Sequence, residues 1–187
     1  MTESRLLDKK TLLQAARELL VECGYGAMSM RQLAARVGLQ HGSLYHHVAS
    51  KQDLLLDVLM DILRLRLEDW RDGSHSRDLH GYVSFLLNRQ RSHPCEELLL
   101  RHESRHLNCK QQYWLDQMLG ALRMPLRQIL EEGKEEGRYN IQNVDHTTDA
   151  ITALLEAADS MRRKSASTDE QRISTWIMRM SLVALSE

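Results

Sequence analysis

The sequence predicts an all-α protein with about nine helices. Helix-favouring residues dominate its 187 residues, and only two prolines and nine glycines interrupt them. Apolar residues recur three and four positions apart along most of the chain, which is the spacing of one helix face. Hydrophobic residues make up 42% of the chain, so the helices have enough apolar surface to form a packed core.

The first predicted helix carries one apolar stripe and ends at a glycine. The stripe consists of Leu12, Ala16, Leu19, Leu20 and Cys23. Gly24 is expected to stop the helix, because glycine adopts the backbone conformation that helix ends need. Ser29 and Gln32 then form a capping-box pattern, which predicts a second helix from there to about Val37, before Gly38.

Residues 29–48 have the pattern of a helix-turn-helix. Within each helix two apolar residues, four positions apart, form the inner face. A small residue lies where the helices cross, a glycine lies at the turn between them, and an apolar side chain fills the inside of that turn. In chain order these positions are Leu33, Ala34, Val37, Gly38, Leu39, Leu44 and Val48. The second helix of the pair is expected over about 41–48. His47 lies between two inner positions, so we interpret it as a packing residue.

The outer face of that second helix suits the major groove of DNA. Short or flat polar side chains on a narrow helix can reach base edges and phosphates. Gly42 lets the backbone approach the DNA closely, and Lys51 can hold a phosphate together with the backbone N–H groups of the next helix. The candidate DNA-binding residues are Ser29, Arg31, Gln40, His41, Gly42, Ser43, Tyr45, His46 and Lys51.

The charge is unevenly distributed, although the net charge of the whole chain is −1. Residues 1–51 contain seven basic and four acidic side chains, whereas residues 52–187 contain eighteen basic and twenty-two acidic ones. A small basic module on an acidic body favours local contact with phosphates over general adsorption to nucleic acid.

Six further helices are predicted after the helix-turn-helix. Ser50 is a cap for the first of them, with an aspartate in its first turn. Pro94 suits the first turn of another, Pro125 is expected to kink or split the longest, and Gly137 is expected to end it. A capping-box pattern at 168–171 precedes the last. Their approximate ranges are 51–70, 77–91, 94–107, 111–136, 145–163 and 169–184.

Residues 12–56 resemble the DNA-binding domain of the TetR family of transcriptional regulators. The run GYGAMSMRQLAARVGLQHGSLYHHVASKQDLL follows that family's order of a glycine and an aromatic residue, a hydroxyl cap, a short helix, Val-Gly, then Leu-Tyr-x-His and a lysine. The end of the longest helix, Gly133 to Tyr139, matches the family's G-x-x-x-G-x-Y pattern. Val48 stands where the family usually has phenylalanine, and Gln40 replaces a common serine or threonine, which weakens the helix cap there.

The resemblance implies a sequence-specific regulator, typically a repressor that a small-molecule effector releases from double-stranded operator DNA. It also implies a homodimer formed through the last two helices. Residues 1–52 would then be the helix-turn-helix DNA-binding domain, and residues 53–187 the helical ligand-sensing and dimerisation domain. Tyr45 and Lys51 would contact phosphates, and Ser29 would cap its helix near the DNA backbone. The residues placed near bases would be Gln40, His41, Ser43 and His46.

Two apolar sets in the second domain fit these roles. In the family, apolar and aromatic residues of the central helices often line an effector cavity, although the same residues can equally fill a core. The candidate pocket residues are Trp70, Tyr82, Phe85, Trp114, Met118 and Leu122. Stripes on the last two helices can associate with a second copy or be buried within one monomer. The candidate interface residues are Ile151, Leu155, Ala158, Ile173, Trp176, Ile177 and Met180.

Other functions fit parts of the sequence less well. Residues 102–106 match the HExxH pattern of zinc proteases, but that chemistry also needs a third ligand and an open position, so we assign no catalytic residue, cofactor or metal. A metal effector is an alternative, because histidines and cysteines gather at 93–109. Oxidation of Cys95 or Cys109 is another, whereas Cys23 is expected to pack inside. A helical interaction protein that binds no DNA is the third.

The sequence favours a cytoplasmic location without membrane contact. The first twenty residues mix charged residues with leucines at helical spacing, unlike a secretory signal. No apolar run reaches the length that spans a bilayer. The three cysteines form no CxxC pair and suit a reducing compartment.

Overall fold

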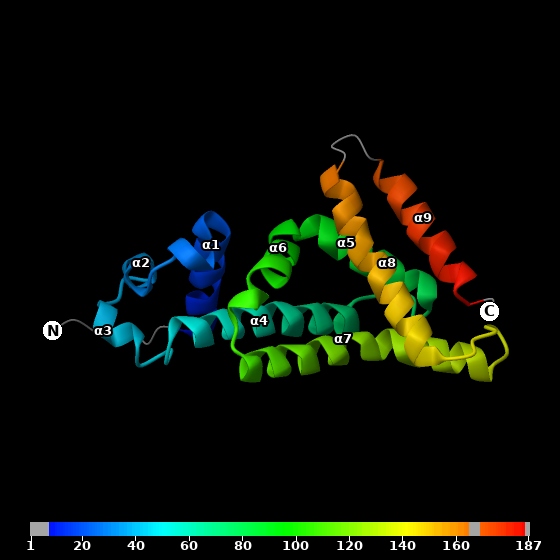
Figure 1. The fold of residues 1–187 in the computed structure, drawn as a ribbon, viewed down its shortest axis with the longest axis horizontal. Coiled ribbons are helices and arrows are strands. Elements are labelled where there is room, and N and C mark those ends of the chain that lie inside the picture. Colours follow the sequence, from blue (N-terminus) through cyan, green and yellow to red (C-terminus); the bar gives the residue numbers. More distant parts are fainter. Residues whose placement is uncertain (1–7, 165–168, 186–187) are drawn as a thin grey trace. The chain divides into compact units, whose positions relative to one another are not determined.

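The computed structural model describes residues 8–164 and 169–185, and these fold into nine α-helices and one short 3-10 helix (Figure 1). The all-α prediction is therefore confirmed. In chain order the elements are α1 (Lys9–Ala27), α2 (Met30–Arg36), α3 (His41–Leu44), α4 (Lys51–Asp72), α5 (Leu79–Ser92), α6 (Pro94–His102), η1 (Ser104–His106), α7 (Cys109–Glu135), α8 (Val144–Lys164) and α9 (Glu170–Val183).

The helices group into two compact units, and the chain passes between them three times. The N-terminal unit contains the described residues up to Arg66 together with Cys95–Met118. The C-terminal unit contains Leu67–Pro94 and the described residues from Leu119 onwards. The unit that includes the helix-turn-helix therefore also includes most of α4, α6, η1 and the first turns of α7. The division of roles at residue 52 remains a prediction.

Side-chain caps start several helices where the sequence places them. The Ser50 hydroxyl accepts from the Asp53 backbone N–H at 3.0 Å and donates to the Asp53 carboxylate at 2.6 Å, which caps α4. At α9 the Asp169 carboxylate accepts from the Gln171 N–H at 3.0 Å, whereas Thr168 of the predicted capping box lies outside the described residues.

Two predicted helix ranges extend several residues beyond the helices in the structure. The helix expected over 41–48 stops at Leu44 and continues as a turn. The helix from Pro94 ends at His102, ahead of η1, and not near residue 107. Pro125 lies inside α7 and does not split it. Leu126, Ile129 and Leu130 beside this proline are all buried, and their packing offsets the backbone hydrogen bond that proline cannot donate.

The core of the C-terminal unit is apolar and is built mainly from α5, α7, α8 and α9. Trp70 lies at its α4 end, with its ring 5.3 Å from those of Tyr82 and Phe85. Helix α5 contacts both α8 and α9, and α8 contacts α9, as Figure 1 shows. Five residues of the predicted dimer stripe lie inside this core: Ile151, Leu155, Ala158, Ile173 and Ile177.

A buried polar network joins the same three helices. The Gln90 amide of α5 donates to the Leu155 carbonyl at 3.0 Å and accepts from the Arg162 guanidinium at 2.9 Å. Arg162 also forms an ion pair with Glu170 at 2.6 Å, which brings in the first turn of α9. The network fixes how α8 and α9 pack on α5, because each buried polar group needs its partner in place.

No helix among the described residues combines the length and the apolar character that crossing a membrane requires.

The N-cap of α5 provides a test of pH-dependent stability. Asp78 accepts from the Gly81 N–H at 2.8 Å, and this hydrogen bond lowers the pKa of the Asp78 carboxyl. A lowered native pKa stabilises the fold above the unfolded pKa of about 4, and this contribution is lost as the pH falls through the native value.

We expect Asp78→Ala to reduce the free energy of unfolding by about 1 kcal/mol at pH 7, because the cap is lost, and by less near pH 2. Urea denaturation followed by circular dichroism at both pH values measures this. Asp78→Asn keeps a capping oxygen without the titratable charge, so it is the matched control. An equal loss in Asp78→Ala at both pH values would contradict the ionised cap.

Candidate nucleic-acid interface

The predicted capping box begins α2. The Ser29 N–H donates to the Gln32 side-chain oxygen at 2.8 Å, and the Gln32 N–H donates to the Ser29 hydroxyl at 3.2 Å. Each side chain thus satisfies a backbone donor that the helix itself leaves free. Leu33 and Ala34 are buried on the inner side, so the cap also sets which face of α2 points outwards.

A Schellman motif ends α2 and redirects the chain into α3. The Leu39 N–H donates to the Ala34 carbonyl at 2.9 Å, and the Gly38 N–H donates to the Ala35 carbonyl at 3.3 Å. This closure needs a left-handed residue between the two helices, and Gly38 has φ +71°. Both the glycine and its role are as the sequence predicts.

Helix α3 is short and is anchored by two buried apolar side chains. Leu44 is 0% exposed and Val48 is buried, although Val48 is smaller than the phenylalanine usual in the resembled family. Gln40 is the N-cap residue but makes no side-chain capping bond, as its replacement of a hydroxyl residue predicts. With a weak cap and one helical turn, α3 depends on its anchors for its position.

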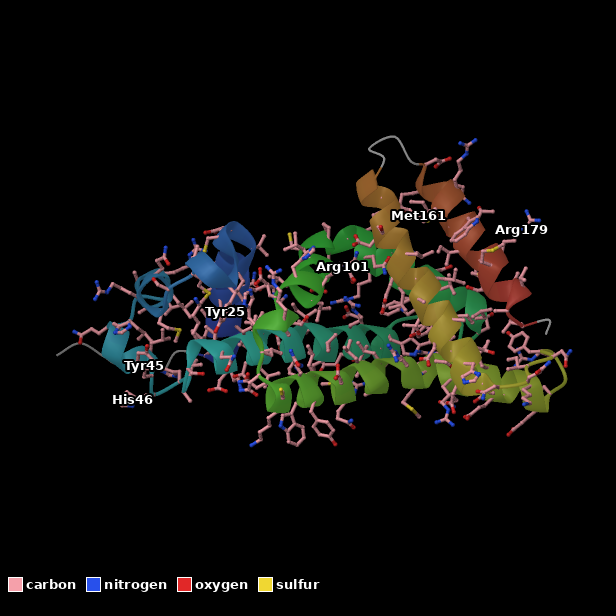
Figure 2. The ribbon with its side chains drawn as sticks, viewed as in Figure 1. Tyr25, Tyr45, His46, Arg101, Met161 and Arg179 are labelled. Atoms are coloured by element: carbon pink, nitrogen blue, oxygen red, sulfur yellow. The ribbon has the colours of Figure 1, made fainter. Side chains whose placement is uncertain are left out.

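The outer face of α3 and of the following turn is polar and exposed. Figure 2 labels Tyr45 and His46 here, and Tyr45 is 46% exposed. The Tyr45 ring makes an edge contact with His41 at 5.2 Å. Gln40, His41, Gly42 and His46 are exposed, and Ser43 is half-buried. The predicted base-facing residues are therefore accessible to solvent on α3 and its flanking turns, Ser43 least of all.

Two side chains that were expected to pack inside are exposed. His47 was interpreted as an inner packing residue, but α3 ends at Leu44 and the turn carries His47 to the surface. Cys23 is also exposed; it lies in the last regular turn of α1 before Gly24, and its Sγ donates to the Leu19 carbonyl at 3.1 Å. The His47 prediction extended helical periodicity beyond the point where the regular helix stops.

The cations near this surface differ in their partners. Both Arg36 guanidinium NH groups bond the Glu22 carboxylate, at 2.8 and 2.7 Å, and these bonds lower the pKa of Glu22 and raise that of Arg36. Arg31 is exposed on α2 beside the Ser29 cap. Lys51 opens α4, and its ammonium lies 4.2 Å from the centre of the Tyr25 ring.

Tyr25 makes contacts with His106 and Glu103 that the sequence did not predict. Its ring stacks on His106 with centroids 4.7 Å apart and planes inclined by 23°. Its backbone N–H donates to the Glu103 carboxylate at 3.3 Å. Burial, with a smaller contribution from the Asp53 carboxylate, raises the pKa of the Tyr25 phenol, which keeps it neutral. The aromatic residue after Gly24 was visible as part of the family pattern, but its partner was not.

The HExxH pattern does not form the helix face that a zinc protease needs. Helix α6 ends at His102, Glu103 is buried against Tyr25, and His106 belongs to η1. The described residues also contain no group of three or more His, Cys, Asp or Glu side chains arranged to hold a metal ion. Cys95 and Cys109 are free and exposed.

The predicted pocket residues are divided between the two compact units. Trp70, Tyr82 and Phe85 are buried in the C-terminal unit, where the Tyr82 hydroxyl donates to the Leu122 carbonyl at 3.1 Å. Trp114 is exposed and Met118 half-buried in the N-terminal unit. A groove of about 400 Å³ lies along α5, and Phe85 is the one predicted pocket residue in its lining. Its lining residues are Asp69, His75, Ser76, His80, Gly81, Ser84, Phe85, Asn88, Arg89, Ser92 and His93.

Comparison with known proteins agrees with this geometry. The family model described as bacterial regulatory proteins, tetR family, matches residues 12–58, which cover α2, α3, most of α1 and the first turns of α4. The class D tetracycline repressor protein of Escherichia coli is 28% identical over 168 residues, which are 88% of this chain and 74% of the repressor.

Two solved structures share the fold. The transcriptional regulator FadR from Bacillus subtilis, in complex with stearoyl-CoA, has a TM-score of 0.79 at 17% identity and covers 95% of this chain and 99% of its own. AibR, in complex with isovaleryl coenzyme A and operator DNA, has a TM-score of 0.72 at 16% identity and covers 92% and 97%. The likeness extends over both compact units.

The turn glycine allows a direct test of the helix-turn-helix. A Cβ on Gly38 would meet nothing within 4 Å, so Gly38→Ala adds backbone strain without a clash. We expect it to lower the free energy of unfolding by about 1 kcal/mol in urea denaturation. Gly42→Ala also has open space but lies within α3, and we expect no loss of stability there. Equal stability of Gly38→Ala and the unchanged protein would contradict the Schellman motif.

Proposed function

We propose that this chain is a DNA-binding transcriptional regulator of the TetR family, and that it is a homodimeric repressor whose affinity for a palindromic operator falls when a small molecule binds. The observation that carries this proposal is the surface of α3, where polar side chains stand outwards while Leu44 and Val48 anchor the helix from within. Such a repressor works in the cytoplasm, where its operator lies.

In the proposed complex α3 enters the major groove. Its imidazole, amide and hydroxyl groups donate to and accept from base edges, and Gly42 allows close approach. Tyr45 and Lys51 contact phosphates on either side and set the register, with Ser29 and Arg31 near the DNA backbone. The residues that we assign to base contacts are Gln40, His41, Ser43 and His46.

The outer face of α9 is our proposed dimer contact. Ile173 and Ile177 point into the monomer core, whereas Trp176, Leu182 and Val183 on the same helix are 41%, 50% and 58% exposed. Large apolar side chains exposed together favour association, and a two-fold axis brings the same patch of both copies into contact. A two-fold dimer matches an operator whose half-sites are about one DNA turn apart.

The groove along α5 is our candidate effector site. It combines the Asp69–Arg89 ion pair, three imidazoles, from His75, His80 and His93, and the apolar ring of Phe85. This lining favours a ligand that carries hydrogen-bonding groups beside an apolar part. Such a ligand lowers DNA affinity if it binds better to an arrangement in which the two recognition helices no longer fit successive grooves.

Lys51 offers a test of phosphate contact. We expect Lys51→Ala to weaken binding to every DNA sequence and to reduce the slope of log affinity against log salt by about 0.9, because one phosphate contact is lost. Fluorescence anisotropy with random-sequence duplexes measures both quantities. Lys134→Ala is the matched control, since Lys134 is an exposed lysine of the C-terminal unit. An unchanged salt slope in Lys51→Ala would rule out the phosphate role.

Selection of bound fragments from sheared host genomic DNA tests the proposed function as a whole. At near-physiological salt we expect the purified protein to enrich a shared imperfect palindrome. His46→Ala should enrich a palindrome with altered base preference, with little change in affinity for random DNA. If the folded dimer enriches nothing, even after denaturation and refolding to remove a co-purified ligand, the proposal is wrong.

A further inference from the structure

The Tyr25 ring, labelled in Figure 2, lies between a candidate DNA contact and the α6–α7 junction. The Lys51 ammonium is 4.2 Å from the centre of the ring, within the range of a cation–π interaction. His106 of η1 stacks against the same ring at 4.7 Å. The aromatic ring therefore connects the first turn of α4 with the segment that joins α6 to α7, all within the N-terminal unit.

His106 is itself held by other groups. Its Nε2 lies 3.4 Å from the Glu103 carboxylate, the same group that accepts from the Tyr25 N–H. Its backbone carbonyl accepts from the Gln52 amide at 2.6 Å. Glu103 is only 8% exposed, so its carboxylate depends on these partners. These contacts fix the position of the His106 imidazole on which the Tyr25 ring stacks.

A second set of contacts joins the two helix starts. Asn108 and Gln111 cap α7 reciprocally, at 2.9 and 3.2 Å. The Gln111 amide also donates to the Asp53 carboxylate at 2.8 Å, and the Asn108 amide donates to the Gln52 side chain at 3.2 Å. The caps of α4 and α7 therefore bond to each other, and Lys51 stands at the first position of the joined pair.

We propose that Tyr25 and His106 are positioning residues that hold the Lys51 ammonium ready for a DNA phosphate. This inference rests on the phosphate contact proposed for Lys51. A lysine side chain has many rotamers, and the aromatic face favours those in which the ammonium stays at the start of α4. The contacts of Tyr25 with His106 and Lys51 affect only a phosphate contact. A shift of the α6–α7 junction therefore changes the affinity for all DNA sequences alike and leaves base preference unchanged.

A double-mutant cycle on random-sequence duplex DNA tests the proposal. We expect Tyr25→Leu to weaken binding about two- to fivefold, the size of a surface cation–π interaction, and to do so only while Lys51 is present. In the Lys51→Ala background the same change should have almost no effect. Tyr25→Phe keeps the aromatic face and should bind as the unchanged protein does.

The salt dependence separates positioning from loss of folding. Tyr25→Leu should reduce the salt slope towards that of Lys51→Ala, which a general loss of folded protein would not do. Circular dichroism and gel filtration check the fold and the oligomeric state. If Tyr25→Leu folds poorly, His106→Leu tests the same contact, because it removes the imidazole that stacks on Tyr25. It should weaken binding and lower the salt slope in the same way. His106→Phe keeps an aromatic ring at this position and should bind as the unchanged protein does.

The outcomes distinguish this inference from the proposed function. If Lys51→Ala lowers the salt slope but Tyr25→Leu and His106→Leu act equally in both backgrounds, the positioning role is wrong and the phosphate contact stands. If either change raises affinity, the ring holds Lys51 away from DNA and the inference is also wrong. If Lys51→Ala leaves the slope of log affinity against log salt unchanged, both the phosphate contact and the positioning role are wrong.

Discussion

The N-terminal unit depends on one requirement, which is that the unpaired backbone N–H groups at each helix start must find an acceptor. At α2 and α4 a serine hydroxyl meets it within four residues. The capping side chains of α4 and α7 also bond to each other, because the Asp53 carboxylate of α4 accepts from the Gln111 amide of α7. A local need of two helices thereby fixes their relative position, and it places Lys51 beside residues of the α6–α7 junction. The position of the proposed phosphate contact therefore follows from ordinary helix capping.

Partly buried ion pairs join α6 to α1 and α4. Arg17 of α1 pairs with Asp61 of α4 at 2.9 Å and lies 3.6 Å from Glu96 of α6, and Arg66 of α4 pairs with Glu97 of α6 at 2.5 Å. Such a pair adds little net stability over apolar packing, but removing one partner leaves the other charge without its counterion in a poorly solvated position. These pairs therefore specify where α6 docks more than they strengthen the fold.

Features that depend on neighbours in sequence were predictable, and features that depend on distant neighbours were not. The Ser29 cap and the Gly38 turn need residues three to five positions away, so a sequence pattern reveals them. The apolar stripe of α8 is equally visible, but periodicity cannot tell whether Leu155 faces its own core or a second copy. The partner of His106 is Tyr25, which lies far away in the chain, and no local pattern links the two. His106 is part of the HExxH pattern, but that pattern is typical of a zinc site and does not predict stacking on Tyr25.

The threefold passage of the chain between the compact units has a consequence for recombination. The unit that carries α3 includes Cys95–Met118, which lies far along the chain from the helix-turn-helix. A chimera made by exchanging the first fifty residues would separate Arg17 from Glu96 and Tyr25 from His106. A functional graft would have to transfer the α6–α7 segment as well. If the outer face of α3 reads the operator as proposed, operator choice on this scaffold diversifies more easily by point substitution there than by exchange of whole modules.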